Sequence, residues 1–350
     1  MRRSSILALA VLAILLLMTG CASNTVTVYT DMDRKDVEKL IKPFSDKTGI
    51  KLDLVHFNEV HDLVDAIAVP DGASYKLVMH ETLYQPADLV LSGNMFAGDV
   101  LRARSALAQY EPSGADAIPP GAKNLGNWYG FGGRLWVLAY NTNLVKGDLP
   151  RSLFDLSSNV FPNGKISTIT PNYCPFYIGA ACAIKGKAAA VTLYQTLINR
   201  HAEFVNKPEL AAKSIAEGSA WAGITTLAAV VAQKKAGAPI GWVIPDQGSG
   251  NMGAYVEFYS VCTPILGKNT INAHLLADYL LSTEAEALSV EMGLSDATLR
   301  QGTSAALVVI PLAIDLDSAS VAWTQDLSEL MPYFHQYSPS FISDTKGWIK

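Results

Sequence analysis

The segment 24–57 alternates between the patterns of a strand and a helix, and it constrains the fold more than any other feature. Residues 24–29 alternate polar and apolar side chains, which is typical of a strand with one buried face. A helix is predicted next, because apolar residues recur at the spacing of one buried helical face: Val37, Leu40, Ile41 and Phe44. Gly49 is predicted to end this helix, and residues 50–57 to form the next strand. A strand–helix–strand unit predicts a parallel sheet flanked by helices.

The same alternation continues along the chain and predicts an α/β fold. Further strands are predicted at 88–91, 165–169, 221–225 and 240–244, with helices between them, including one at 73–84. Towards the carboxyl end, Asn272 and Thr283 are predicted to cap the starts of two helices. The chain has 350 residues, of which 49% are apolar, and this is enough for about two domains with buried cores.

The stretch Asn127–Asn143 is a long extended segment with an unusual composition. Its first half contains three glycines, at 130, 132 and 133, which leave the backbone few restrictions. Its second half is a continuous apolar run, as in a fully buried strand, and Arg134 is the only charge. Two interpretations fit this pattern. The segment is either a hinge that crosses between two lobes and lines a cleft, or a central strand with a glycine bulge and a surface arginine.

The amino terminus has the pattern of an export signal. Arg2 and Arg3 precede an apolar core at residues 6–18, which is too short to span a bilayer comfortably. The following Leu-Met-Thr-Gly-Cys, ending at Cys21, resembles the lipobox of bacterial lipoproteins, with Met18 where that motif usually has leucine. The resemblance implies a signal peptide at 1–20 and a lipidated Cys21 that anchors an extracytoplasmic protein to a membrane. The alternative is an ordinary cleaved signal with an incidental cysteine.

Three further cysteines are present, Cys174, Cys182 and Cys262. Because their number is odd, at least one of them stays unpaired in a monomer. Spacing alone does not decide whether Cys174 and Cys182 form a disulfide or whether all three are small buried residues. Their spacing matches no common zinc motif.

An ordered set of segments resembles one protein family. Val-Thr-Val-Tyr-Thr at 26–30 is followed by Phe-Ser-Asp-Lys-Thr-Gly-Ile at 44–50 and Ala-Asp-Leu-Val-Leu-Ser at 87–92. Gly-Gly-Arg-Leu-Trp-Val-Leu-Ala-Tyr-Asn-Thr then occupies residues 132–142. This order is similar to that of the extracellular solute-binding proteins of bacterial ABC importers, in the branch that includes binders of ferric iron, polyamines, thiamine, phosphonates and sugar phosphates.

The resemblance implies a type II periplasmic-binding-protein fold, in which two α/β lobes hold a ligand between them. Residues 25–140 would form the first part of lobe one, 141–250 lobe two, and 251–350 the return to lobe one. The first crossing would lie in Asn127–Asn143 and the return crossing at 246–253. The implied partners are a small-molecule ligand and an ABC permease in the cytoplasmic membrane, and the protein would act as a monomer.

Polar loops that follow the predicted strands are the candidate ligand-binding sites, because ligands of open parallel sheets bind at the carboxyl ends of strands. Helix amino termini in such loops favour anions. Arg134 is predicted to add a charge-assisted contact, and Trp128 and Tyr129 either to stack on the ligand or to belong to the core. The loop residues predicted to bind ligand are Thr30, Asp31, Ser92, Gly93, Asn94, Thr170, Asn172, Tyr173, Thr225, Thr226, Ser249 and Asn251.

The expected ligand is a small organic or phosphorylated anion. Many ferric-binding relatives carry adjacent tyrosines at the place that matches residues 223–226, where this chain has two threonines, which are poor iron ligands. Ferric iron stays as the alternative, because Tyr29, Tyr129 and Tyr173 lie near predicted loops. The acidic and histidine side chains between His56 and Asp62 lack a metal-binding spacing and are interpreted as a solvated face. A sensor or adhesion lipoprotein with the same fold is a further alternative.

No enzyme signature is present in the sequence. Ser249 lacks the glycine two residues before it that a nucleophile elbow requires. Ser343–Lys346 and Lys47–Gly49 match two motifs of penicillin-recognising enzymes, but in reversed order. Neither a catalytic metal set nor a cofactor fingerprint occurs, so no cofactor is expected. The net charge of −5 gives no reason to expect nucleic acid as a partner.

Overall fold

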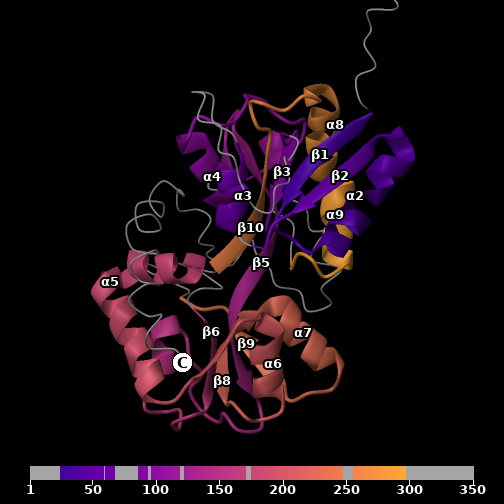
Figure 1. Ribbon diagram of the computed structural model, residues 1–350. Coiled ribbons are helices and arrows are strands. Elements are labelled where there is room, and N and C mark those ends of the chain that lie inside the picture. The colour runs from indigo at the N-terminus through magenta and orange to yellow at the C-terminus, as the bar shows by residue number, and fades with distance from the viewer. Residues whose placement is uncertain are drawn as a thin grey trace, which may run out of the picture.

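The computed structural model describes residues 24–58, 60–67, 86–93, 96–118, 122–170, 175–246 and 255–296. These residues form two α/β lobes that are joined by the strands β5 (Trp128–Asn141) and β10 (Tyr255–Cys262) (Figure 1). The strand order β2-β1-β3-β10-β5-β8-β6-β7 runs through both lobes, and β4 (Lys123–Asn124) and β9 (Ile240–Val243) pair with β5 beside this path. The α/β fold predicted from the alternating patterns is confirmed.

The first lobe contains the predicted strand–helix–strand unit. Strands β1 (Thr25–Thr30), β2 (Lys51–His56) and β3 (Leu89–Ser92) are parallel, and β10 joins β3 in the antiparallel direction. The lobe's helices are α2 (Arg34–Thr48), α3 (Val60–Ala66), α4 (Phe96–Ala103), α8 (Thr270–Leu280) and α9 (Thr283–Glu291).

Helix α2 shows why this unit forms. The Asp33 side chain accepts hydrogen bonds from two N–H groups of the first turn, and Gly49 ends the helix in a left-handed conformation with φ 72°. The four predicted apolar residues form its buried face. The predicted caps of α8 and α9 were wrong, because Asn269 and Ser282 occupy those positions. The predicted helix at 73–84 lies outside the described residues.

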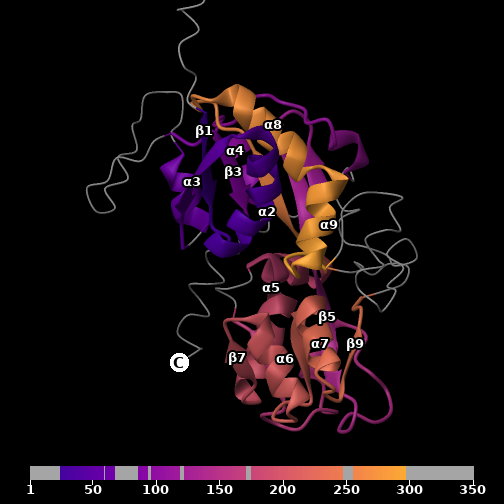
Figure 2. The same cartoon turned by 90° about the vertical axis from the view of Figure 1, so that its right-hand side faces the viewer.

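The second lobe is built from β6 (Ile166–Ile169), β7 (Glu203–Val205) and β8 (Ala222–Thr226), together with β9. Its helices are α5 (Pro175–Asn199), α6 (Pro208–Ala216) and α7 (Leu227–Lys235). A 90° turn of the molecule shows α8 and α9 along the first lobe, with α9 reaching towards the second (Figure 2). No helix in the described part of the chain combines the length and hydropathy needed to cross a membrane.

Strand β5 changes partners along its length. It pairs with β10 from Trp128 to Trp136, with β8 from Trp136 to Tyr140 and with β9 from Leu138 to Asn141. The register with β10 shifts between Glu257 and Tyr259, opposite Gly132, whose φ is +54°. The strand therefore contains the glycine bulge of one interpretation and also runs from one lobe to the other.

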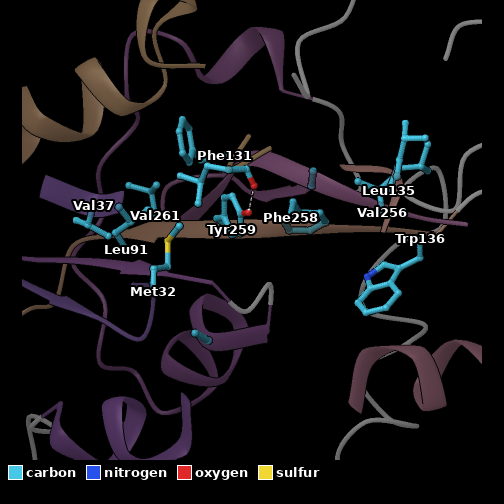
Figure 3. Packing of buried hydrophobic residues seen from close by; sticks show 14 of the residues in the cluster. Met32, Val37, Leu91, Phe131, Leu135, Trp136, Val256, Phe258, Tyr259 and Val261 are labelled. Carbon is cyan, nitrogen blue, oxygen red and sulfur yellow. Dashed lines mark hydrogen bonds between the residues drawn. The ribbon is translucent and has the colours of Figure 1, made fainter. Parts of the chain in front are cut away.

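Buried side chains follow the paired strands β5 and β10 without interruption. Figure 3 shows Phe131, Tyr259 and Phe258 in succession, then Val256 and Leu135, with Trp136 beyond them. Trp136 is only 1% exposed although it stands where β5 passes from the first lobe to the second. The connection between the lobes is thus a packed strand pair with a local irregularity.

Candidate functional site

The carboxyl ends of β1 and β3 bring four predicted site residues together. The Asp31 carboxylate accepts hydrogen bonds from the Gly93 N–H at 2.6 Å and from the Ser92 hydroxyl at 3.2 Å. Thr30 is buried, and its hydroxyl oxygen accepts the N–H of Met32 at 3.1 Å. Because parallel strands end at the same edge of a sheet, residues 61 and 62 positions apart in sequence meet here.

This arrangement determines what the first lobe presents to a ligand. Burial raises the pKa of Asp31, while the hydrogen bonds from Gly93 and Ser92 and the nearby His56 lower it. The Gly93 N–H, which an incoming anion would need as a donor, already binds a carboxylate. The first-lobe loop therefore presents an acceptor and suits a ligand group that donates hydrogen bonds.

The crossing strands add an acid that the sequence analysis missed. Glu257 on β10 lies directly opposite Arg134 on β5, and its Oε2 accepts the indole N–H of Trp136 at 3.2 Å. Burial raises the pKa of Glu257, Arg134 and the Trp136 hydrogen bond lower it, and Asp31 raises it further. Asp31, Arg134 and Glu257 therefore form one electrostatically coupled group. A single acid within the otherwise uncharged strand Tyr255–Cys262 was the available sequence signal.

Arg134 is held against Tyr259. Its Nε donates to the Tyr259 hydroxyl at 3.1 Å, and the centre of its guanidinium group lies 6.0 Å from the ring centroid. The Tyr259 hydroxyl in turn donates to the carbonyl oxygen of Leu294. Burial raises the pKa of Tyr259 to about 12, so this hydroxyl keeps its proton at neutral pH. The partners fix the direction of Arg134 before any ligand arrives.

The second-lobe residues differ in accessibility. Thr225 is fully buried, and its hydroxyl donates to the carbonyl oxygen of Pro208 at 2.6 Å. Thr226 is buried at the start of α7 and lies opposite Trp136 in the β5–β8 pair. Thr170 follows β6 and is half-buried, and its N–H donates to Val205. Of these three residues, Thr170 has the side chain best placed to reach a ligand.

Trp128 and Tyr129 lie in the core of the first lobe. They are 1% and 2% exposed, at the end of β5 that pairs with β10 residues Cys262 and Val261. The Trp128 indole N–H donates to Asp99 at 3.3 Å, and the Tyr129 hydroxyl donates to the Tyr110 carbonyl at 3.2 Å. The structure therefore corrects their place in the predicted site, because both side chains pack inside the lobe, as the alternative interpretation has it.

Other predicted positions lie outside the described residues. These are Asn94, Asn172, Tyr173, Ser249 and Asn251 in the predicted binding loops, and Cys21 in the lipobox. Cys174 is also outside them, whereas Cys262 is buried with a free thiol whose pKa burial raises. Within the described ranges, no three His, Cys, Asp or Glu side chains are grouped so that they could hold a metal ion.

Comparison with known proteins identifies relatives of this fold. The model of the family described as bacterial extracellular solute-binding protein matches residues 25–295. None of the curated proteins matches the sequence.

Several solved structures share the two-lobed architecture. Iron-bound HitA from Pseudomonas aeruginosa is 21% identical with a TM-score of 0.70, covering 89% of this chain and 98% of HitA. The ferric binding protein from Campylobacter jejuni is 15% identical with a TM-score of 0.75, covering 91% and 98%. AfuA from Actinobacillus pleuropneumoniae, solved with fructose-6-phosphate, is 20% identical with a TM-score of 0.68, covering 90% and 98%. At these identities the likeness shows the fold and leaves the ligand open.

Proposed function

The chain belongs to the bacterial extracellular solute-binding proteins, and we propose that it captures a small organic anion between its lobes for an ABC permease. In this proposal, residues 25–140 and 251–350 form lobe one and residues 141–250 form lobe two. Cys21 carries the lipid that keeps the protein at the membrane surface. Ligand binding favours a closed arrangement, because only that arrangement offers contacts from both lobes.

The group of Asp31, Arg134 and Glu257 is the observation that supports the ligand class. Two acids and one arginine beside the crossing strands suit a ligand that carries both hydroxyl groups and a negative charge. The hydroxyls would donate to Asp31 and Glu257, and the charged group would bind Arg134. A phosphorylated sugar has both features, and AfuA, which shares the fold, was solved with fructose-6-phosphate.

Ferric iron is the second candidate, because several proteins of this fold bind iron. The described residues argue against it on two grounds. Thr225, at the place where ferric-binding relatives were expected to carry tyrosine, is buried with its hydroxyl bound to Pro208. Burial also raises the pKa of Asp31 and of Glu257, which disfavours the ionised form that a hard cation needs.

Calorimetry against a panel of solutes tests the proposal. The panel contains sugar phosphates, phosphonates, polyamines, thiamine and ferric citrate. We expect binding of a hydroxylated anion and none of ferric citrate. The proposal fails if the folded protein binds none of the organic anions.

Three substitutions test the role of Arg134. Arg134→Ala should weaken binding of the identified anion by about 10–100-fold, the value of a lost charge-assisted contact. Arg34→Ala removes the same charge from an exposed ion pair on α2 and should leave affinity unchanged. Tyr259→Phe removes the hydrogen-bond partner of Arg134 but keeps the guanidinium group. If Arg134→Ala lowers stability while affinity stays at the wild-type value, Arg134 braces the strands and does not bind ligand.

A further inference from the structure

Asp296, in the segment after α9, binds the edge of the crossing strand β5. Its N–H donates to the Gly133 carbonyl at 2.7 Å, and its Oδ2 accepts the Leu135 N–H at 2.6 Å. Residues 133 and 135 direct their backbone groups to the same edge, because strand residues alternate with a period of two. Asp296 therefore binds the backbone of β5 as a residue of a neighbouring strand would. It does so in the part of β5 between the residues that pair with β4 and those that pair with β8.

The segment that carries Asp296 is itself firmly held. Leu294 accepts the Tyr259 hydroxyl through its carbonyl oxygen, and the Ser295 hydroxyl lies 3.0 Å from that of Ser289. The N–H of Ser295 also donates to the Ser289 carbonyl at 3.1 Å. Asp296 is thus joined rigidly to α9 and, through Tyr259, to β10 of the first lobe.

The same side chain faces the second lobe across a cavity. A cavity of about 240 Å³ separates α7 from the end of α9, and both Asp296 and the α7 residues Leu227 and Ala228 line it. The carboxyl group of Asp296 lies where the positive end of the α7 dipole and the Ala228 N–H favour its ionised form. Asp296 is 2% exposed, and its Oδ1 accepts no hydrogen bond from the described residues.

Burial opposes the ionised form more strongly than these groups favour it. It raises the pKa of Asp296 to about 7, against the lowering by the Leu135 N–H, Arg134 and the Ala228 N–H. The titratable and charged groups of the elements packed around Asp296 are Arg134 on β5, Glu257 and Tyr259 on β10, Glu286 and Glu291 on α9, and Lys235 on α7. An acid whose pKa is raised in one arrangement stabilises that arrangement at low pH and loses this contribution as pH rises through the raised pKa.

We propose that Asp296 is a proton-sensitive latch between the lobes. When its carboxyl group is neutral, it holds β5 and the start of α7 in the arrangement seen here. When the group ionises, the buried position becomes costly and the two lobes are released to rotate about β5. The relation between solute binding and lobe movement would then depend on the pH outside the cell.

Hydrogen exchange, measured by mass spectrometry from pH 5.5 to 8.5 and corrected for intrinsic rates, tests the latch without any solute. In the wild-type protein, protection of peptides containing Leu135 and the first turn of α7 should fall from pH 5.5 to about pH 7, by at most about tenfold per pH unit, and should level off above pH 7. Asp296→Asn keeps an acceptor for the Leu135 N–H but cannot ionise, so protection of the same peptides should fall less with pH than in the wild-type protein.

Glu291→Gln is the matched control, because Glu291 is an exposed carboxylate that lines the same cavity. It should keep the wild-type profile. A flat wild-type profile overturns the proposal, and so does an Asp296→Asn profile that still follows the wild type. Because no solute is present, failure here leaves the transport proposal standing, and failure of every solute to bind leaves the latch standing.

Discussion

The two halves of β5 are built differently, although they belong to one continuous strand. The first half, residues 128–135, contains three glycines, a register shift and an edge bound by Asp296. The second half, residues 136–141, has no glycine and pairs with β8 and β9. Val137, Leu138 and Ala139 are fully buried there. The irregular half belongs to the first lobe and the regular half to the second.

This difference indicates where the lobes can move relative to each other. A strand paired on both sides moves as part of its sheet, whereas a bulge with a left-handed glycine absorbs changes in backbone angle. The charged groups Arg134, Glu257 and Asp296 all lie beside the irregular half or its end. Binding and bending are therefore located in the same few residues, and three substitutions test this comparison.

The largest expected effect comes from the regular half. Leu138→Ala removes a fully buried side chain and should lower the free energy of unfolding by about 3 kcal/mol. Urea unfolding followed by circular dichroism measures this loss. Solute affinity of the folded protein should stay unchanged, since Leu138 lies away from the charged group. A loss below about 1 kcal/mol would mean that this half is less tightly packed than the structure shows.

A smaller loss is expected from Gly132→Ala in the irregular half. The φ of +54° costs an L-residue about 1–2 kcal/mol, and the new Cβ would lie 2.1 Å from the Ser295 hydroxyl oxygen. We expect a total loss of about 2–3 kcal/mol in unfolding free energy, part of which Ser295→Ala should restore in the double variant.

Gly237→Ala is the control for the cost of a positive φ without a steric clash, because Gly237 has φ +84° and open space around a new Cβ. It should cost only about 1 kcal/mol. Equal losses of unfolding free energy for the Gly132 and Gly237 variants would show that the segment containing Ser295 moves aside without loss of stability. The contact of this segment with β5 would then contribute little to the fold.

The smallest expected effect concerns Glu257. Its pKa is raised by burial, so the ionised side chain destabilises the fold as pH rises through that raised pKa. Glu257→Gln keeps an acceptor for the Trp136 indole and removes this penalty. The variant should therefore be more stable than wild type at pH 8, with the difference shrinking towards pH 5. Thermal unfolding across this range measures it. A growing advantage at low pH would contradict the assigned direction.

Local sequence patterns predicted much of the fold. The unit β1–α2–β2, the face of α2 and the glycine bulge of β5 follow from spacing and backbone preferences within about 30 residues. The start of α8 was not predicted, because Asn269 and Asn272 are the same residue type in sequence. Asn269 occupies the cap position, where its backbone N–H donates to Asp88 and its side-chain amide donates to Thr25, and both partners are distant in sequence.

The site was only partly predictable. The approach of Asp31 to Ser92 and Gly93 follows from parallel strand ends. Trp136, the partner of Glu257, lies 121 positions away in sequence, and Leu135, the partner of Asp296, lies 161 positions away. A local sequence pattern cannot predict contacts between residues this far apart. Trp128 and Tyr129 illustrate the opposite problem, since an aromatic residue has the same sequence pattern whether it packs in a core or stacks on a ligand.

Small-angle X-ray scattering, with and without the solute that calorimetry identifies, tests the central claim most directly. If the solute binds between the lobes and β5 bends at its irregular half, saturation should reduce the radius of gyration of the wild-type protein. Arg134→Ala should need a correspondingly higher solute concentration for the same reduction. An unchanged radius of gyration at saturation would contradict capture by lobe closure.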